Sequence, residues 1–168
     1  QFEGKEFRVA VSEKNHKYVL VEETKDVVDK AVHDRNLAVE ERFGCEIVLA
    51  HTSDHWAKAE QFIQRAVLSQ EDQFDIAAHH AVSLGNLVLQ DFFMNWYDVP
   101  AIDFSKPWWS DSTVETLTFN DTCLVAIGDF ALTALSNAYC VYYNKVDADT
   151  YKLPDLYEVV NEGKWTLD

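Results

Sequence analysis

Short apolar runs alternate with longer amphipathic stretches along most of this chain. Runs typical of strands lie at 6–11 (EFRVAV), 17–22 (KYVLVE), 45–50 (CEIVLA), 74–78 (FDIAA), about 123–128 (CLVAIG) and 138–144 (AYCVYYN). The runs at 45–50, 74–78 and 138–144 lack a polar alternation, so we expect them to be the most buried strands. The polar residues SEKNH would form a turn between the first two strands.

Helical periodicity separates these runs. Thr24 can begin a helix that Gly44 ends. Its inward face would be formed by Val28, Val32, Val39 and Phe43. A second amphipathic helix follows the HTSD loop, and further helices are expected at 81–90 and 151–162. The alternation of strand and helix predicts an α/β domain with a parallel sheet and right-handed crossovers.

The charge of the chain narrows the possible partners. It carries 29 acidic and 14 basic residues, a formal net charge of -15, within 168 residues that are 48% hydrophobic. This composition predicts a folded domain, and its negative field repels nucleic acid and anionic membrane surfaces. The charge itself fits either solubility or a cationic ligand.

The cysteines and the chain ends carry less information. Cys45, Cys123 and Cys140 all lie in apolar runs without CxxC spacing, which favours buried free thiols and leaves a Cys45–Cys140 bridge open. No apolar run approaches the roughly 18 residues of a membrane span. The polar start at Gln1 indicates a mature or trimmed chain, so location cannot be inferred from these residues alone.

Several motifs occur together in one order along the chain. They are VEET and RNLAVEERFG in the first third, FDIAAHH at 74–80, SKPWW at 105–109, LVAIGD at 124–129, YCVYYNK at 139–145 and EGKWTLD at 162–168. In this order and spacing the chain resembles the first lobe of a bacterial extracellular solute-binding protein, family 1, the substrate-binding component of ABC importers. His79 and His80 stand where the family more often has apolar or small polar residues.

The resemblance implies both an architecture and a function. The fold would be a three-layer lobe of the type II periplasmic-binding-protein class with a central mixed, mostly parallel sheet. Residues 1–144 would form the first lobe, and 145–168 would begin the crossover into a second lobe. The implied function is non-catalytic capture of a solute, a sugar or oligosaccharide, in a cleft between two lobes, without a cofactor. The implied partner is the membrane permease, and the implied location is extracytoplasmic, as a cell-surface lipoprotein or periplasmic protein. An isolated lobe would bind weakly and could self-associate.

The candidate binding residues come from a general rule. Open α/β sheets bind ligands outside the carboxyl ends of their strands, which selects the loops after 45–50, after 74–78 and around Gly128. The residues selected are Thr52, Ser53, Asp54, His79, His80, Asp129 and Phe130. Asp54 could equally cap the following helix, and Asp129 could stabilise a turn.

Aromatic residues offer a further contact for a sugar. Trp108 could present its ring to the apolar face of a pyranose, although adjacent aromatic residues on a connection more often anchor it to the core. Because side chains alternate along an extended segment, only one of Trp108 and Trp109 should face inwards.

The histidines permit one alternative of another class. His51, Asp54, His55, His79 and His80 carry donors suited to Zn²⁺, so a metal-binding or metal-dependent hydrolase domain is the alternative function. HTSDH is not a strong zinc motif, and the sequence has no GxSxG, HExxH or glycine-rich phosphate loop. Non-catalytic binding is therefore the leading prediction.

Overall fold

The computed structural model describes residues 2–166, with side-chain surroundings for all of these except residues 56 and 81–83. The chain divides into two compact units, Gln1–Ser136 and Asn137–Asp168, which are described separately. The protein is a mixed α/β structure with a parallel sheet, as the alternation of apolar runs predicts.

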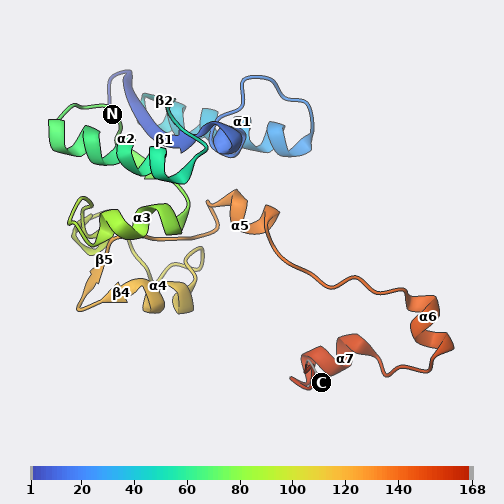
Figure 1. The fold of residues 1–168 in the computed structure, drawn as a ribbon. Helices are drawn as coiled ribbons and strands as arrows, with labels where there is room; N and C mark the ends of the chain where they lie inside the picture. Colours follow the sequence, from blue (N-terminus) through green and yellow to red (C-terminus); the bar gives the residue numbers. More distant parts are fainter. Residues whose placement is uncertain (1, 167–168) are drawn as a thin grey trace. The chain divides into compact units, whose positions relative to one another are not determined.

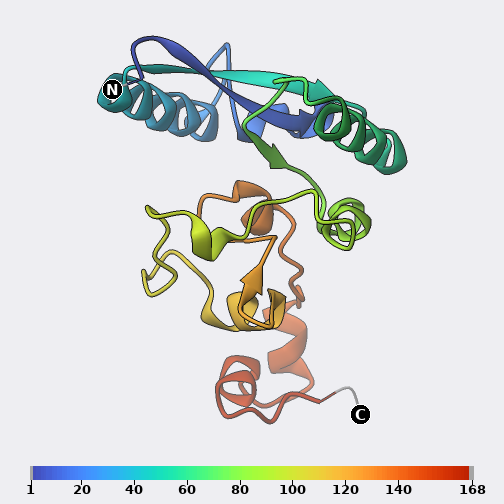
Figure 2. The same cartoon turned by 90° about the vertical axis from the view of Figure 1, so that its left-hand side faces the viewer.

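The first unit is built around a three-stranded sheet. β1 (Lys5–Ser12), β2 (Cys45–Thr52) and β3 (Ile76–Ala78) pair in parallel in the order β2-β1-β3 (Figures 1 and 2). The helices α1 (Val27–Phe43) and α2 (Trp56–Ser69) provide the connections between successive strands. Ser12 pairs with Thr52, and Val11 pairs with Ala78, so the carboxyl ends of all three strands meet at one edge.

The central strand is the most buried, which corrects the expectation for 45–50 and 74–78. Val9, Ala10 and Val11 of β1 are at most 7% exposed, whereas Ile47 of β2 and Ile76 of β3 are half-buried. An edge strand has one unpaired side, so an apolar run does not by itself lead to full burial. The position of β1 between two partners decides the difference.

The prediction of a strand at 17–22 is wrong. Glu13–Tyr18 form a 3-10 helix, η1, and residues 19–26 form no regular element. The amides of Val19 and Leu20 both donate to the His16 carbonyl, 2.8 Å away. The Val19 carbonyl accepts from the buried side chain of Asn36 on α1, at 2.6 Å. These bonds occupy backbone groups that a strand would use to pair with a neighbouring strand.

Helix α1 begins and packs differently from the prediction. Its N-cap is Asp26, whose carboxylate accepts from the amides of Val28 and Asp29, and it ends at Gly44 with φ 68° as expected. Val32 is buried, but Val28, Val39 and Phe43 are exposed. The buried face instead includes Asn36, because hydrogen bonds to the 18–20 turn orient the helix.

A hydrophobic cluster holds α2 against α3 (Ala81–Val88). Ile63 and Leu87 are fully buried and Leu84 nearly so. The half-buried residues packed around them are Phe62, Phe74, Ala77, Phe92, Phe93 and Val125. This cluster joins the sheet layer to the later part of the first unit.

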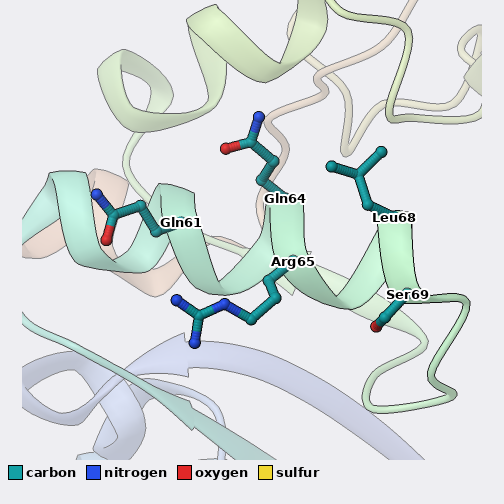
Figure 3. A pocket seen from close by; sticks show the side chains of 5 residues that line it. All are labelled: Gln61, Gln64, Arg65, Leu68 and Ser69. Atoms are coloured by element: carbon teal, nitrogen blue, oxygen red, sulfur yellow. The ribbon is translucent and has the colours of Figure 1, made fainter.

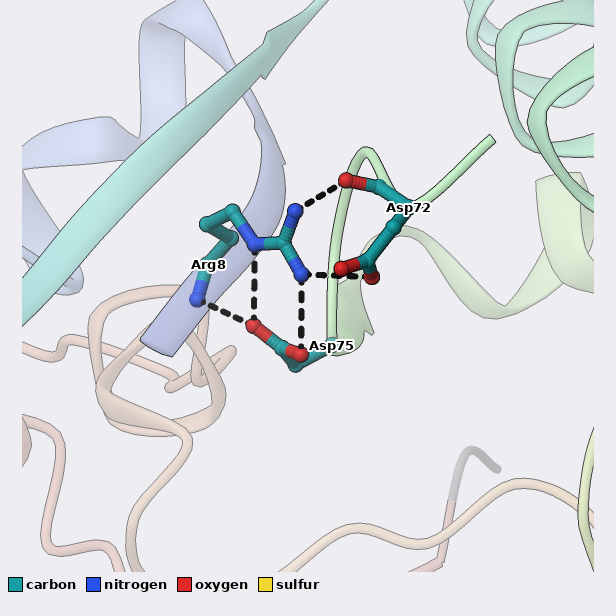
Figure 4. A network of polar contacts seen from close by, with 3 residues as sticks. All are labelled: Arg8, Asp72 and Asp75. Carbon is teal, nitrogen blue, oxygen red and sulfur yellow. Dashed lines mark hydrogen bonds and ion pairs between the residues drawn. The ribbon is translucent and has the colours of Figure 1, made fainter. Parts of the chain in front are cut away.

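The network of Arg8, Asp72 and Asp75 fixes the loop between α2 and β3 (Figure 4). The Arg8 guanidinium donates to both carboxylates and to the Asp72 carbonyl, with an Nη2–Oδ1 distance of 2.6 Å to Asp72. The Arg8 amide donates to the Asp75 carboxylate at 2.7 Å, and the Asp75 amide returns a bond to the Arg8 carbonyl at 2.9 Å. These contacts set the register of β3 against β1, and they lower the pKa of Asp75 through the hydrogen bond from Arg8.

The later part of the first unit is less regular than predicted. Its elements are η2 (Trp96–Asp98), α4 (Asp111–Leu117), the antiparallel pair β4 (Thr118–Phe119) and β5 (Thr122–Cys123), and α5 (Leu132–Ser136). The strand expected at 123–128 therefore ends at Cys123. The Asn95 carboxamide oxygen accepts from the amide of Cys123 at 2.9 Å, so this pair is anchored to the start of η2.

The second unit contains two short helices, α6 (Lys145–Thr150) and α7 (Leu156–Asn161). The helix expected at 151–162 is reduced to α7, which follows Pro154 and is capped by Asp155. The strand expected at 138–144 does not form, and Tyr139 and Tyr142 are 104% and 90% exposed. Within the described residues this segment has no strand partner to satisfy its backbone groups, so its apolar sequence is insufficient for a buried strand.

Candidate functional site

Three polar residues converge where the strands of the parallel sheet end. Ser12 closes β1, Thr52 closes β2, and His79 follows β3 directly. Ser12 and Thr52 are each 6% exposed, and His79 is half-buried. Since β1 lies between β2 and β3, these side chains border one edge, as the strand-end rule predicts.

Thr52 and His79 are joined directly across this edge. His79 Nε2 and Thr52 Oγ1 are 3.2 Å apart, and the backbone amide of His80 donates to His79 Nδ1 at 3.0 Å. Burial lowers the pKa of His79, and the nearby His80 adds to that effect while Asp54 opposes it. Because Nδ1 accepts from the His80 amide, the His79 ring is neutral in this arrangement, with both ring nitrogens in hydrogen bonds.

Asp54, in the loop after β2, binds Lys14 of η1. Its Oδ1 accepts from the Lys14 amide at 2.9 Å, and its Oδ2 lies 3.9 Å from Lys14 Nζ. The N-cap of α2 is His55, so the capping role considered for Asp54 does not apply. The neighbouring Ser53 hydroxyl accepts from the His55 amide at 3.2 Å.

A second group of predicted residues gathers around Gly128. The Asp129 amide donates to the Trp108 carbonyl at 2.9 Å, and Gly128 forms an antiparallel bridge with Trp109. A Cβ at Gly128 would lie 2.7 Å from the Trp108 carbonyl oxygen, so this close approach requires glycine. The Phe130 ring meets the Trp109 ring edge-on, with 5.4 Å between centroids.

The two tryptophans differ in exposure, as expected for a pair of which only one faces inwards, although residues 107 and 108 lie in a turn and not in an extended segment. Trp109 is 8% exposed and packs among the rings of Trp96, Phe104 and Phe130. Trp108 is 49% exposed and is the one available to a solute.

A link between the two groups runs through α5. Helix α5, which follows Phe130, contacts η1, the element that carries Lys14. No hydrogen bond or ring contact within the described residues joins Asp129, Phe130 or Trp108 to Thr52, Ser53, Asp54, His79 or His80. The strand-end residues thus contact one another and form the candidate site. The residues around Gly128 lie next to α5, which contacts η1.

A surface hollow lies elsewhere, on α2 (Figure 3). It has a volume of about 380 Å³, and its lining side chains all project from that helix: Gln61, Gln64, Arg65, Leu68 and Ser69. It contains none of the predicted binding residues, and a single helix surface does not enclose a solute.

Within the part of the chain that the structure describes, the histidines and cysteines share no ligand arrangement for a metal ion. The His16 and His51 rings meet edge-on at 6.1 Å between centroids. Among residues 2–166, no group of three His, Cys, Asp or Glu side chains is placed to hold a metal ion. The three cysteines are free thiols, and only Cys123 is fully buried; Cys45 is half-buried and Cys140 exposed, which corrects the expectation of three buried thiols.

Two residues of the strand-end site were missed by the sequence reasoning. Ser12 and Lys14 were assigned to a turn between two strands, but Ser12 ends the central strand and Lys14 binds Asp54. The same strand-end rule applied to the run at 6–11 would have selected Ser12. The role of Lys14 depends on a contact 40 residues away in the sequence and leaves no local signal.

Comparison with known proteins adds no family assignment. The chain matches no protein-family model, and no curated protein aligns with it significantly. In the part of the chain that is described, no helix is both long and apolar enough to cross a membrane.

Proposed function

We propose that this chain is the first lobe of a type II solute-binding protein that captures a sugar or oligosaccharide for an ABC importer. The observation that carries the proposal is the convergence of Ser12, Thr52 and His79 at the carboxyl edge of a parallel sheet. Supporting it are the motifs SKPWW, LVAIGD, YCVYYNK and EGKWTLD, which occur in the order typical of that family.

The chemistry of the edge suits an uncharged polyol. The two buried hydroxyls of Ser12 and Thr52 supply hydrogen-bond groups, the His79 imidazole contacts the Thr52 hydroxyl, and the nearby Asp54 is already engaged by Lys14. A buried group left without its partner costs about 1–3 kcal/mol, so such a site discriminates strongly for a ligand that satisfies it. The exposed ring of Trp108 offers a stacking surface for the apolar face of a sugar.

Under this proposal the second lobe supplies the remaining contacts and closes over the solute. A lobe alone leaves much of the ligand in water, and losing about 4 kcal/mol of contacts reduces affinity roughly a thousandfold. Binding to this chain should therefore fall in the millimolar range when the two-lobed protein binds in the micromolar range.

The test is titration of maltose, cellobiose and xylobiose into ¹⁵N-labelled chain, followed by amide shifts, with calorimetry on a version extended through a second lobe. We expect shifts at Thr52, His79 and their neighbours, and binding about a thousandfold tighter for the extended protein. Thr52→Val should weaken binding about tenfold.

Thr116→Val is the matched control, because the Thr116 hydroxyl is exposed and donates within α4 to the Ser112 carbonyl at 2.7 Å. It should leave binding unchanged. Equal, tight binding by the single lobe and the extended protein would contradict the two-lobe cleft. Shifts centred on the α2 hollow instead of the strand ends would contradict the site.

A further inference from the structure

We propose that His79 is a positioning residue that makes the Thr52 hydroxyl a dedicated hydrogen-bond donor towards an acceptor oxygen of the bound solute. This inference rests on the proposed function. It adds the direction of the hydrogen bond and therefore the kind of ligand atom that the site selects.

The tautomer of His79 follows from its backbone contact. The amide of His80 donates to His79 Nδ1 at 3.0 Å, so Nδ1 must present a lone pair. A neutral imidazole has one donor and one acceptor nitrogen, and the bond at one nitrogen decides the state of the other. The proton of His79 therefore resides on Nε2.

The orientation of the Thr52 hydroxyl follows in turn. With its proton on Nε2, His79 donates to Thr52 Oγ1 across 3.2 Å, so Thr52 accepts in this contact. The hydroxyl proton must then point away from His79. Among the described side chains and backbone groups, no acceptor for that proton is found, although Thr52 is only 6% exposed.

Ser12 gives an independent indication of the same kind. It is 6% exposed, pairs in register with Thr52, and makes no side-chain cap bond to η1. Its hydroxyl has no partner among the described residues. Two adjacent buried hydroxyls with unfilled hydrogen-bonding capacity indicate a site completed by an oxygen-bearing ligand, since buried hydroxyls are normally satisfied.

The charges around His79 favour an uncharged acceptor. His80 and Asp54 face it with opposite electrostatic effects, and Asp54 is itself engaged by Lys14. The two uncharged hydroxyls of Thr52 and Ser12 therefore match a hydroxyl or ring oxygen of the ligand. A cationic group has no acceptor to meet at the Thr52 proton.

The test reads the His79 side chain by long-range ¹H–¹⁵N correlation at neutral pH, first without ligand. We expect an Nε2-bound proton with a slowed exchange rate and a contact to the Thr52 methyl group. Thr52→Val, which keeps the shape and removes the hydroxyl, should speed exchange of that proton about two- to tenfold. Thr52→Ser should restore the slow rate, which a purely packing role would not predict.

Sugar binding then tests the consequence. With cellobiose as the probe, Thr52→Val and His79→Gln should each weaken binding, and the double variant should lose little more than either alone, because the two residues act as one unit. A proton on Nδ1, or an exchange rate unaffected by Thr52→Val, would overturn the inference. The expected Nε2 behaviour without binding of any sugar would support the His79–Thr52 arrangement and count against the proposed function, so the two failures are distinguishable.

Discussion

Replacing Leu87 by alanine tests the cluster that joins α2 to α3. Leu87 is fully buried and packs with Ile63 and Leu84, which are also shielded from solvent. A buried Leu→Ala change costs about 2–5 kcal/mol through lost transfer energy and the remaining cavity. The surrounding phenylalanine rings are only half-buried and can move partly into the space. We therefore expect a loss near 3 kcal/mol.

That loss is large on the scale of a domain. Total unfolding free energies lie at about 5–15 kcal/mol, and a chain of this length shifts its Tm by about 2–4 °C per kcal/mol. Leu87→Ala should therefore lower the Tm by about 6–12 °C. The assay is urea denaturation followed by tryptophan fluorescence and far-UV circular dichroism, with calorimetry for the Tm.

Leu89 supplies a matched control two residues away. Its side chain is 87% exposed, so Leu89→Ala should change stability by no more than about 0.5 kcal/mol. If Leu89→Ala cost as much as Leu87→Ala, the burial pattern of α3 and the reasoning built on it would be refuted.

Three further outcomes follow from the contacts. Arg8 lowers the pKa of Asp75, so the folded protein gains stability above the ordinary pKa of 3.8, and this stability is lost as pH falls below that value. In a plot of the urea unfolding midpoint against pH, Asp75→Asn should therefore flatten the slope in this acidic range. Burial lowers the pKa of His79 below its ordinary 6.5, so stability is present above pH 6.5 and decreases as pH falls through that value; His79→Gln should remove this decrease, and an unchanged slope would contradict it. The exposed, uncharged segment 138–144 should drive self-association, so Tyr142→Glu should reduce dimer formation in sedimentation velocity while Val27→Glu, also at an exposed apolar residue, should not.

The sequence alone predicted the class of fold and several local features. The alternation of apolar runs with helical stretches predicted a parallel α/β sheet, and Gly44 predicted the end of α1. That only one of the two adjacent tryptophans faces inwards was also predicted, whereas the structure decided that the buried one is Trp109. These features depend on local periodicity and on the conformational freedom of glycine, both of which can be read from neighbouring residues.

Part of the candidate site was predictable for the same reason. His79 directly follows the apolar run at 74–78 and Thr52 lies two residues after the run at 45–50, and the carboxyl ends of parallel strands meet at one edge. The hydrogen bonds that these side chains make could not be predicted from the sequence. The amide of His80 sets the tautomer of His79, and the Lys14 amide engages Asp54 from 40 residues away.

Tertiary structure decided burial and the fate of the ambiguous strands. The most buried strand is β1, since its two edges are both paired, although its sequence is no more apolar than that of 45–50. Residues 17–22 turn instead of extending because Asn36 binds the Val19 carbonyl. Residues 138–144 have strand-like composition but no partner among the described residues. A strand is stabilised by hydrogen bonds to a neighbour, and the presence of that neighbour is a property of the whole fold, not of the segment.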